Sequence, residues 1–261
     1  MNLNKNTIKA KKGAKMNANL ATKTNGAVGS HTPLSSWGTP TVSAKMLLIP
    51  KIMIMQLTSK LVRDEQAVFG DFISSLTEKK IGSYKQPMEI IPIQMYEMWV
   101  EFDIVKGARE FRGMVPVTEA NDNWSFKDVD QDGKPIERDR VANLYCLLPG
   151  DVKQGGELPY LLSFRSTSRI AGRKIATQMY ALNSGAGKSP AAKTFQILGE
   201  KKEGQKGAWI QLDAKVARDT EPQEEQAALK WFKTIMAGQT KVEHNDIVEE
   251  TRSESKNVAD Y

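Results

Sequence analysis

The sequence predicts a mainly β (α+β) fold: an OB-like β-barrel with one inserted helix, one C-terminal helix and disordered tails at both ends. Three observations support this prediction. Several strand-like runs are separated by glycine and proline turns, only two stretches have helical spacing, and both end segments are too polar to bury a core. The order of strands, helix and two further strands is compatible with an OB-like barrel. With 261 residues, 40% of them hydrophobic, the chain can bury a sizeable core.

The strands begin with Val42–Met55, an apolar segment that we assign to the first core strand. The long run Pro87–Val105 carries Tyr96, Trp99 and Phe102 and is followed by a turn at Lys106–Ala108. Further strands are expected at Glu110–Val117, Val141–Leu148 and Leu158–Phe164. A late hairpin is expected from Thr194–Leu198 and Ala208–Val216, joined by a lysine- and glycine-rich loop, Gly199–Gly207.

Helical spacing of apolar residues predicts an inserted helix over Ser166–Leu182 and a C-terminal helix over Glu221–Ala237. The C-terminal helix has Thr220 as a candidate N-cap, Pro222 in its first turn, a capping-box spacing at Gln223 and Gly238 at its end. Its apolar stripe should dock on the domain through Trp231, Phe232 and Ile235.

Charge is unevenly distributed along the chain. Residues 1–30 hold six lysines and no acidic residue, and we interpret residues 1–40 as a disordered basic arm. The arm is either simply solvated or attracts polyanions. Residues 243–261 carry a net charge of −4, so 241–261 is predicted to be an acidic flexible tail. Between them, residues 31–242 carry +4, and we expect one binding domain over residues 41–240.

Scarce histidine and cysteine argue against an enzyme. Cys146, the single cysteine, lies in an apolar run and is expected to be a buried hydrophobe. His31 and His244 lie in polar segments, where neither can serve a zinc site or a histidine-based triad. We therefore expect no cofactor and no metal, although a carboxylate-only enzyme stays open. No run of about eighteen apolar residues is present, so we expect no membrane contact and a cytoplasmic location.

Two nucleotide- or metal-like motifs fail on context. Ser184–Ser189 ends like a phosphate-binding loop, but Leu182 stands where the pattern needs glycine, and a helix rather than a strand precedes it. Asp128–Asp139 begins like a calcium loop, but its flanks are extended and its last ligand would be an aspartate. An Asp-Gly turn between two strands is the simpler interpretation.

Basic residues interspersed with aromatic ones provide the strongest functional signal. Arg169 and Arg173 are four residues apart on the inserted helix, with Arg165 one turn earlier, so the three should form a stripe. Single-strand binders combine such cations with aromatic rings that stack on bases. A solvated helix face is the alternative. The predicted nucleic-acid-binding residues are Arg165, Arg169, Arg173, Lys174, Lys188, Lys193, Lys201, Lys202, Trp124 and Phe126.

Three features of the chain occur together: the acidic tail Glu243–Tyr261, which ends in an aromatic residue, the β-rich core of about residues 41–217, and the segment Leu158–Tyr180. In these features the chain resembles phage-encoded single-stranded DNA-binding proteins, which have an OB-fold core and a flexible acidic tail that often ends in an aromatic residue. The lysine-rich N-terminus departs from the simplest members. The resemblance implies that the tail, with Glu249, Glu250, Asp260 and Tyr261, competes with DNA for the groove and recruits replication proteins.

Three hypotheses follow for the function. The first is single-stranded DNA binding in phage DNA replication or recombination. The second is a virion or assembly protein whose arm and tail mediate self-association, so a homo-oligomer is among the expected partners. The third is a metal-dependent enzyme that uses the Asp128–Asp139 loop.

Overall fold

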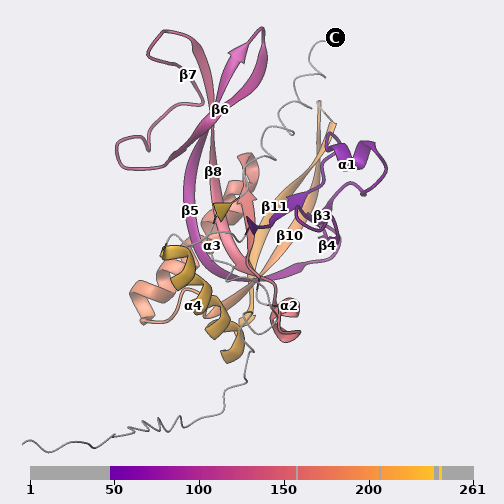
Figure 1. Ribbon diagram of the computed structural model, residues 1–261, viewed down its shortest axis with the longest axis vertical. Helices are drawn as coiled ribbons and strands as arrows, with labels where there is room; N and C mark the ends of the chain where they lie inside the picture. The colour runs from indigo at the N-terminus through magenta and orange to yellow at the C-terminus, as the bar shows by residue number, and fades with distance from the viewer. Residues whose placement is uncertain (1–47, 157, 206, 238–240, 243–261) are drawn as a thin grey trace, which may run out of the picture. The chain divides into compact units, whose positions relative to one another are not determined.

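The computed structural model describes residues 48–156, 158–205, 207–237 and 241–242 (Figure 1). The predicted basic arm, 1–40, lies outside these residues, and so does the predicted tail beyond Val242. The residues outside the described ranges therefore include both histidines and the four predicted tail residues: His31, His244, Glu249, Glu250, Asp260 and Tyr261.

Strands dominate the described residues, and the fold is mainly β, of the OB-like barrel type. The strands are β1 (Leu48–Ile49), β2 (Lys51–Ile54), β3 (Asp71–Ser74), β4 (Lys80–Ser83), β5 (Met88–Val105), β6 (Ala108–Pro116), β7 (Lys127–Val129), β8 (Pro135–Leu147), β9 (Tyr160–Phe164), β10 (Lys193–Gly204), β11 (Gly207–Asp219) and β12 (Lys241–Val242). The helices are α1 (Lys60–Arg63), α2 (Pro149–Lys153), the 3₁₀ turn η3 (Ser166–Ser168), α3 (Arg169–Tyr180), the π-helical η4 (Ala181–Gly185) and α4 (Pro222–Met236).

The long antiparallel pair β5–β8 is the spine of the main sheet, whose order is β11-β10-β5-β8-β9-β2-β3-β4. The same edge of β5 pairs with β10 near its start and with β6 over its second half. The β5–β6 turn contains Lys106 and Gly107, both with positive φ (51° and 83°), as a two-residue hairpin of the primed type requires. The predicted turn at Lys106–Ala108 is confirmed.

The sheet curls so that its two ends approach one another over the main core. The amide of Ile210 on β11 donates a 3.0 Å hydrogen bond to the side-chain oxygen of Gln56, which follows β2. The two ends also meet where Gly199 on β10 lies against Tyr84, just beyond β4. The enclosed core contains side chains from both ends and from α3, including Phe72, Phe164, Ile175, Phe195 and Leu212. This curvature gives the barrel its partly open form (Figure 1).

The opposite face of β5 and β8 forms a second apolar layer under α4. Successive strand residues alternate between the faces, so Ile91 and Leu147 point to this layer whereas Ile90 and Cys146 point to the main core. Ala227 and Ala228 of α4 are buried on the layer, and Trp231 and Ile235 pack beside them. Phe232, expected to dock as well, is 37% exposed.

Several boundary predictions were wrong for local reasons. The described part of the predicted strand Val42–Met55, from Leu48 onward, is not one strand, because Pro50 lacks an N–H and separates β1 from β2. The segment Gly199–Gly207 is not a loop, because most of it continues the hairpin of β10 and β11 around a much tighter turn. The N-cap of α4 is Glu221 rather than Thr220, and the capping-box partner is Glu224 rather than Gln223.

Candidate nucleic-acid interface

A surface groove of about 410 Å³ runs between α3 and β11, at the edge of the curled sheet. The groove combines cationic and apolar side chains. Its lining residues are Ile170, Arg173, Lys174, Thr177, Gln178, Phe195, Ala214, Lys215 and Val216. Because β11 is the first strand of the sheet order, its backbone edge faces α3 rather than another strand.

Helical periodicity places the cations on the outside of α3. Ala171, Ile175 and Met179 are buried in the main core, so the residues between them face outward. Gly172 allows the close approach, because an added Cβ would lie only 3.2 Å from side-chain atoms of Ala142 and Phe164. The helix is also tied to β11 through the Ser168 hydroxyl, which accepts a 2.9 Å hydrogen bond from the Leu212 amide.

The three cations of the groove differ in their surroundings. Lys174 forms a 2.5 Å ion pair with Asp213, and this contact holds the pKa of the Asp213 carboxyl below its ordinary value. Arg173 and Lys215 are exposed. Burial and the neighbouring charge of Arg173 lower the pKa of Arg169, one helical turn before it. The α3 side of the groove therefore has an excess of positive charge, the local condition that attracts phosphate.

The predicted arginine stripe is only partly assembled. Arg169 and Arg173 share a face of α3, but Arg165 precedes the helix in an extended conformation. The helix cannot extend back to Arg165 because Ser166 has a positive φ of 47°. Arg169 also lies 3.8 Å from Glu97 on β5 and is turned toward the strand pair rather than fully toward solvent.

The other predicted lysines lie outside the groove, and most are paired with carboxylates. Lys193 contacts Asp219, whereas Lys201 and Lys202 pair with Glu203 and Glu200 on their own strand. Lys188 is exposed in the loop that follows η4. Of the predicted cations, Arg173 and Lys174 line the α3–β11 groove.

Sequence reasoning missed several exposed side chains beside these cations. Ile170 and Val216 are 56% and 42% exposed in the groove, and Tyr180, at the end of α3, is 73% exposed. Tyr180 lies seven residues after Arg173 and so shares its helix face. Lys215 was also missed, because strand alternation cannot reveal that a helix about 40 residues earlier lies beside it.

The two predicted stacking aromatics belong to another part of the molecule, which we call the distal lobe: residues 97–140, comprising the second half of β5, β6, β7 and the start of β8. Trp124 is half-buried, with its ring 6.2 Å from that of Trp99 and the Arg138 guanidinium 4.1 Å from its centroid. Phe126 is 50% exposed. Neither lines the α3–β11 groove.

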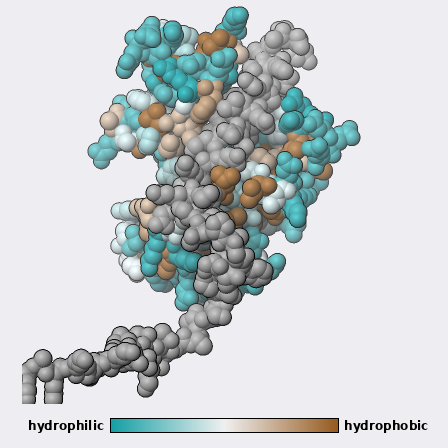
Figure 2. All heavy atoms as spheres, in the orientation of Figure 1, coloured by the Kyte–Doolittle hydropathy of each residue, from teal (hydrophilic) through white to brown (hydrophobic). Residues whose placement is uncertain are grey.

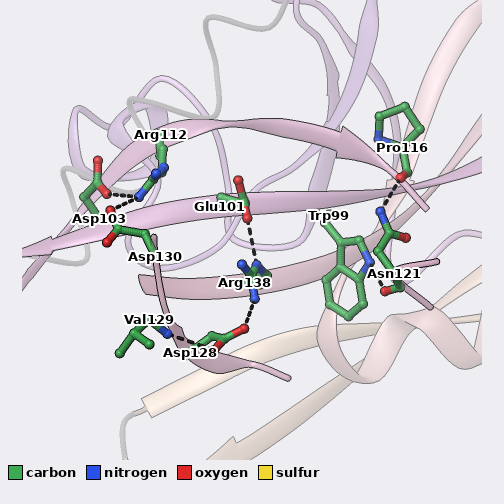
Figure 3. A network of polar contacts seen from close by, with 10 residues as sticks. All are labelled: Trp99, Glu101, Asp103, Arg112, Pro116, Asn121, Asp128, Val129, Asp130 and Arg138. Atoms are coloured by element: carbon green, nitrogen blue, oxygen red, sulfur yellow. Dashed lines mark hydrogen bonds and ion pairs between the residues drawn. The ribbon is translucent and has the colours of Figure 1, made fainter. Parts of the chain in front are cut away.

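Four arginines organise the distal lobe, and each contacts two carboxylates. Figure 3 shows Arg138 between Glu101 and Asp128, and Arg112 between Asp103 and Asp130. The remaining two sets are Arg109 with Glu137 and Asp139, and Arg140 with Glu97 and Asp122.

The calcium-like sequence lies within this network. Asp130 accepts backbone hydrogen bonds from Asp132 and Lys134 and closes the β7–β8 turn, as an Asp-Gly hairpin would. Asp128 and Asp139 point to arginines. Within the described ranges, no group of three or more acidic, histidine or cysteine side chains is arranged to hold a metal.

Comparisons with known proteins give one result. Residues 21–241 match the family model described as Pam3 phage gp34-like protein. No curated protein and no solved structure matches the chain. Within the part of the chain that the structure describes, the helices are too short or too polar to span a bilayer. Because the family model covers most of the chain, the protein belongs to the Pam3 phage gp34-like family.

Proposed function

We propose that this phage protein binds single-stranded nucleic acid, most simply single-stranded DNA during phage DNA replication or recombination. The observation that carries the proposal is the α3–β11 groove, where Arg173, Lys174 and Lys215 surround exposed apolar side chains at the edge of a curled sheet. Proteins that bind single strands combine cations that follow the phosphates with aromatic side chains that stack on the bases.

The distribution of charge supports the same surface. Residues 141–242, which supply α3, β10 and β11, carry +6, whereas the distal lobe carries −4. A polyanion approaching the molecule is therefore attracted to the groove and repelled by the lobe. We accordingly place the bases against Ile170, Val216 and Tyr180 rather than against Trp124 and Phe126.

The direct test is fluorescence anisotropy of a labelled oligothymidylate, titrated with the full chain at several salt concentrations. Arg173→Gln and Lys215→Gln should each weaken binding several-fold and reduce the slope of log K against log salt by about 0.7, the value for one lost single-strand phosphate contact. The matched control is Lys233→Gln, an exposed lysine on α4, which should leave affinity and slope unchanged.

Absence of binding at about 50 mM salt would overturn the proposal, since phosphate contacts are strongest at low salt. Equal losses from Lys233→Gln and Lys215→Gln would also count against it, because they would indicate attraction by net charge alone. A duplex competitor of the same length decides strand preference. It should compete at least tenfold less well, because paired bases cannot reach the apolar wall.

A further inference from the structure

The distal lobe has more carboxylates than cations and therefore carries a net negative charge. It has eleven carboxylates and seven cations, a net charge of −4. Each of its four arginines contacts two carboxylates, so the arginines alone leave four carboxylates unbalanced. Two of the eight carboxylates have a further cation nearby, since Glu97 lies 3.8 Å from Arg169 and Glu137 lies 3.9 Å from Lys127. The surplus of negative charge is therefore distributed along the lobe rather than gathered at one place.

This distribution suits an extended polycation better than a single ion. The paired carboxylates are oriented by guanidinium groups, and the described residues contain no arrangement of three or more metal-ligating side chains. Exposed apolar side chains accompany the charge, since Phe126 and Val129 are 50% and 58% exposed. In Figure 2 the end of the molecule that carries β6 and β7 is mainly hydrophilic, with hydrophobic side chains in small patches.

The chain itself contains a segment of the complementary composition. Residues 1–47 hold seven lysines and no acidic residue, with apolar side chains such as Leu3, Ile8 and Met16 among the lysines. An extended stretch from Lys5 to Lys23 can span up to about 60 Å, whereas the nine residues of β5 in the lobe extend about 30 Å. The extended length and the positive charge of this segment are therefore both sufficient for it to lie along the lobe.

We propose that the distal lobe binds the lysine-rich N-terminal segment, residues 1–47, of a second copy of this chain. Ile49, two residues after this segment, packs in the apolar layer with Ile91 and Leu147, at the end of β5 and β8 that is remote from the lobe. A contact between unlike surfaces of two copies leaves one of each surface free for a further copy, so it produces either a closed ring or an open row of copies. Copies aligned on one nucleic-acid strand would thereby bind cooperatively, a step that rests on the proposed function. The contact between copies does not depend on the proposed function.

The test uses sedimentation velocity of the full chain over a range of concentrations, together with anisotropy of a labelled synthetic peptide of residues 1–30. At about 50 mM salt the average mass should rise with concentration, and at about 500 mM salt it should fall to that of one chain, because the contact is ionic. Glu110→Lys with Glu119→Lys changes two exposed residues outside the arginine sets and brings the lobe from −4 to zero. This variant should remain monomeric and bind the peptide at least tenfold more weakly.

A charge-matched control and a complementation experiment complete the design. Glu65→Lys with Glu78→Lys alters exposed residues outside the lobe and should associate like the unmodified chain. Lys11→Glu with Lys12→Glu should abolish association alone and restore it when mixed with the Glu110→Lys, Glu119→Lys protein. Far-ultraviolet circular dichroism and Tm establish that each variant is folded.

Two outcomes would overturn the proposal. Association or peptide binding that is unchanged by Glu110→Lys with Glu119→Lys would show that the lobe is not the surface. A chain that stays monomeric at every concentration while its lobe binds the peptide would show contact within one copy. Arg173→Gln with Lys215→Gln should leave peptide binding unchanged, so a failure of nucleic-acid binding is distinguishable from a failure of this contact.

Discussion

Arg218 and Glu224 form a bidentate ion pair that joins the end of β11 to the first turn of α4. Both terminal nitrogens of Arg218 lie 2.8 Å from carboxylate oxygens of Glu224. Glu224 is 1% exposed and also accepts a 3.0 Å hydrogen bond from the Glu221 amide, which completes the capping box. The pair therefore fixes where the strand bearing the groove ends and where the covering helix begins.

Replacing Glu224 with Gln should lower the free energy of unfolding by about 1–2 kcal/mol, because Arg218 would lose its bidentate partner but keep the ion pair with Glu89. Urea unfolding followed by tryptophan fluorescence measures this difference. Glu225→Gln, in the same turn and more exposed, should change stability by less than about 0.5 kcal/mol. Equal effects of the two substitutions would mean that first-turn charge, rather than the buried pair, stabilises α4.

The same pair predicts a pH dependence. Burial by itself would raise the pKa of Glu224, but the hydrogen bonds from Arg218 and the Glu221 amide outweigh it and lower the pKa below its ordinary value of 4.5. A carboxyl whose folded pKa is lowered stabilises fully above its unfolded pKa and loses that contribution as pH falls through the folded value. The difference in Tm between the unmodified chain and Glu224→Gln should be constant from pH 7 to 5 and shrink below about pH 4.5. A difference that stays constant to pH 3 would contradict the assignment.

Closure of the curled sheet depends on Gly199. A Cβ there would lie 2.4 Å from the Cβ and 2.8 Å from the Cα of Tyr84, and the latter is a backbone atom that cannot rotate away. Gly199→Ala should therefore separate β10 from the β4 side and cost about 2 kcal/mol or more. Gly113→Ala is the control, because nothing lies within 4 Å of its added Cβ. Thermal unfolding compares the two. A stable Gly199→Ala protein would show that the ends of the sheet do not need this contact.

The long strands, the two long helices α3 and α4 and the β5–β6 turn could be predicted because their signals are local. Alternation over Pro87–Val105 and the apolar spacing of α3 and α4 lie within single elements. Local signals failed where backbone geometry or long-range pairing decides. The positive φ of Ser166 removes Arg165 from the helix, and pairing of β10 with β11 extends strands through residues whose composition is typical of loops.

The groove and the acidic lobe were not predictable for the same reason. Lys215 joins Arg173 only because α3 packs beside the edge strand β11. In the lobe, the partners of Arg138 and Arg140 on β5 are 37 and 43 residues away in the chain. The charges of −4 over residues 97–140 and +6 over residues 141–242 can be counted from the sequence, but only the fold shows that the first range forms a lobe of its own and that the second supplies the groove.

Tyr180 tests whether the interface includes base stacking. The side chain is 73% exposed and continues the face of α3 that carries Arg173. Tyr180→Ala should weaken oligothymidylate binding by about five- to tenfold, within the range of about 1–3 kcal/mol for one stacked base. Tyr180→Phe keeps the ring and should bind normally. If Tyr180→Phe lost as much affinity as Tyr180→Ala, the contact would depend on the tyrosine hydroxyl rather than on stacking of the ring.

Removing residues 243–261 tests whether the acidic tail competes with nucleic acid for the groove. The tail carries −4 and residues 31–242 carry +4, so the two attract at low ionic strength. The truncated chain should bind single strands several-fold more tightly than the full chain at about 50 mM salt, as measured by the same anisotropy titration.

The difference should disappear at about 500 mM salt, where both ionic contacts are screened. A tail of equal length with its six carboxylates changed to amides should behave like the truncation, if competition depends on the charge of the tail rather than on its length. If truncation leaves low-salt affinity unchanged or weaker, the tail does not compete for the groove. A role in recruiting replication proteins would then have to be tested by a direct binding assay with the tail peptide.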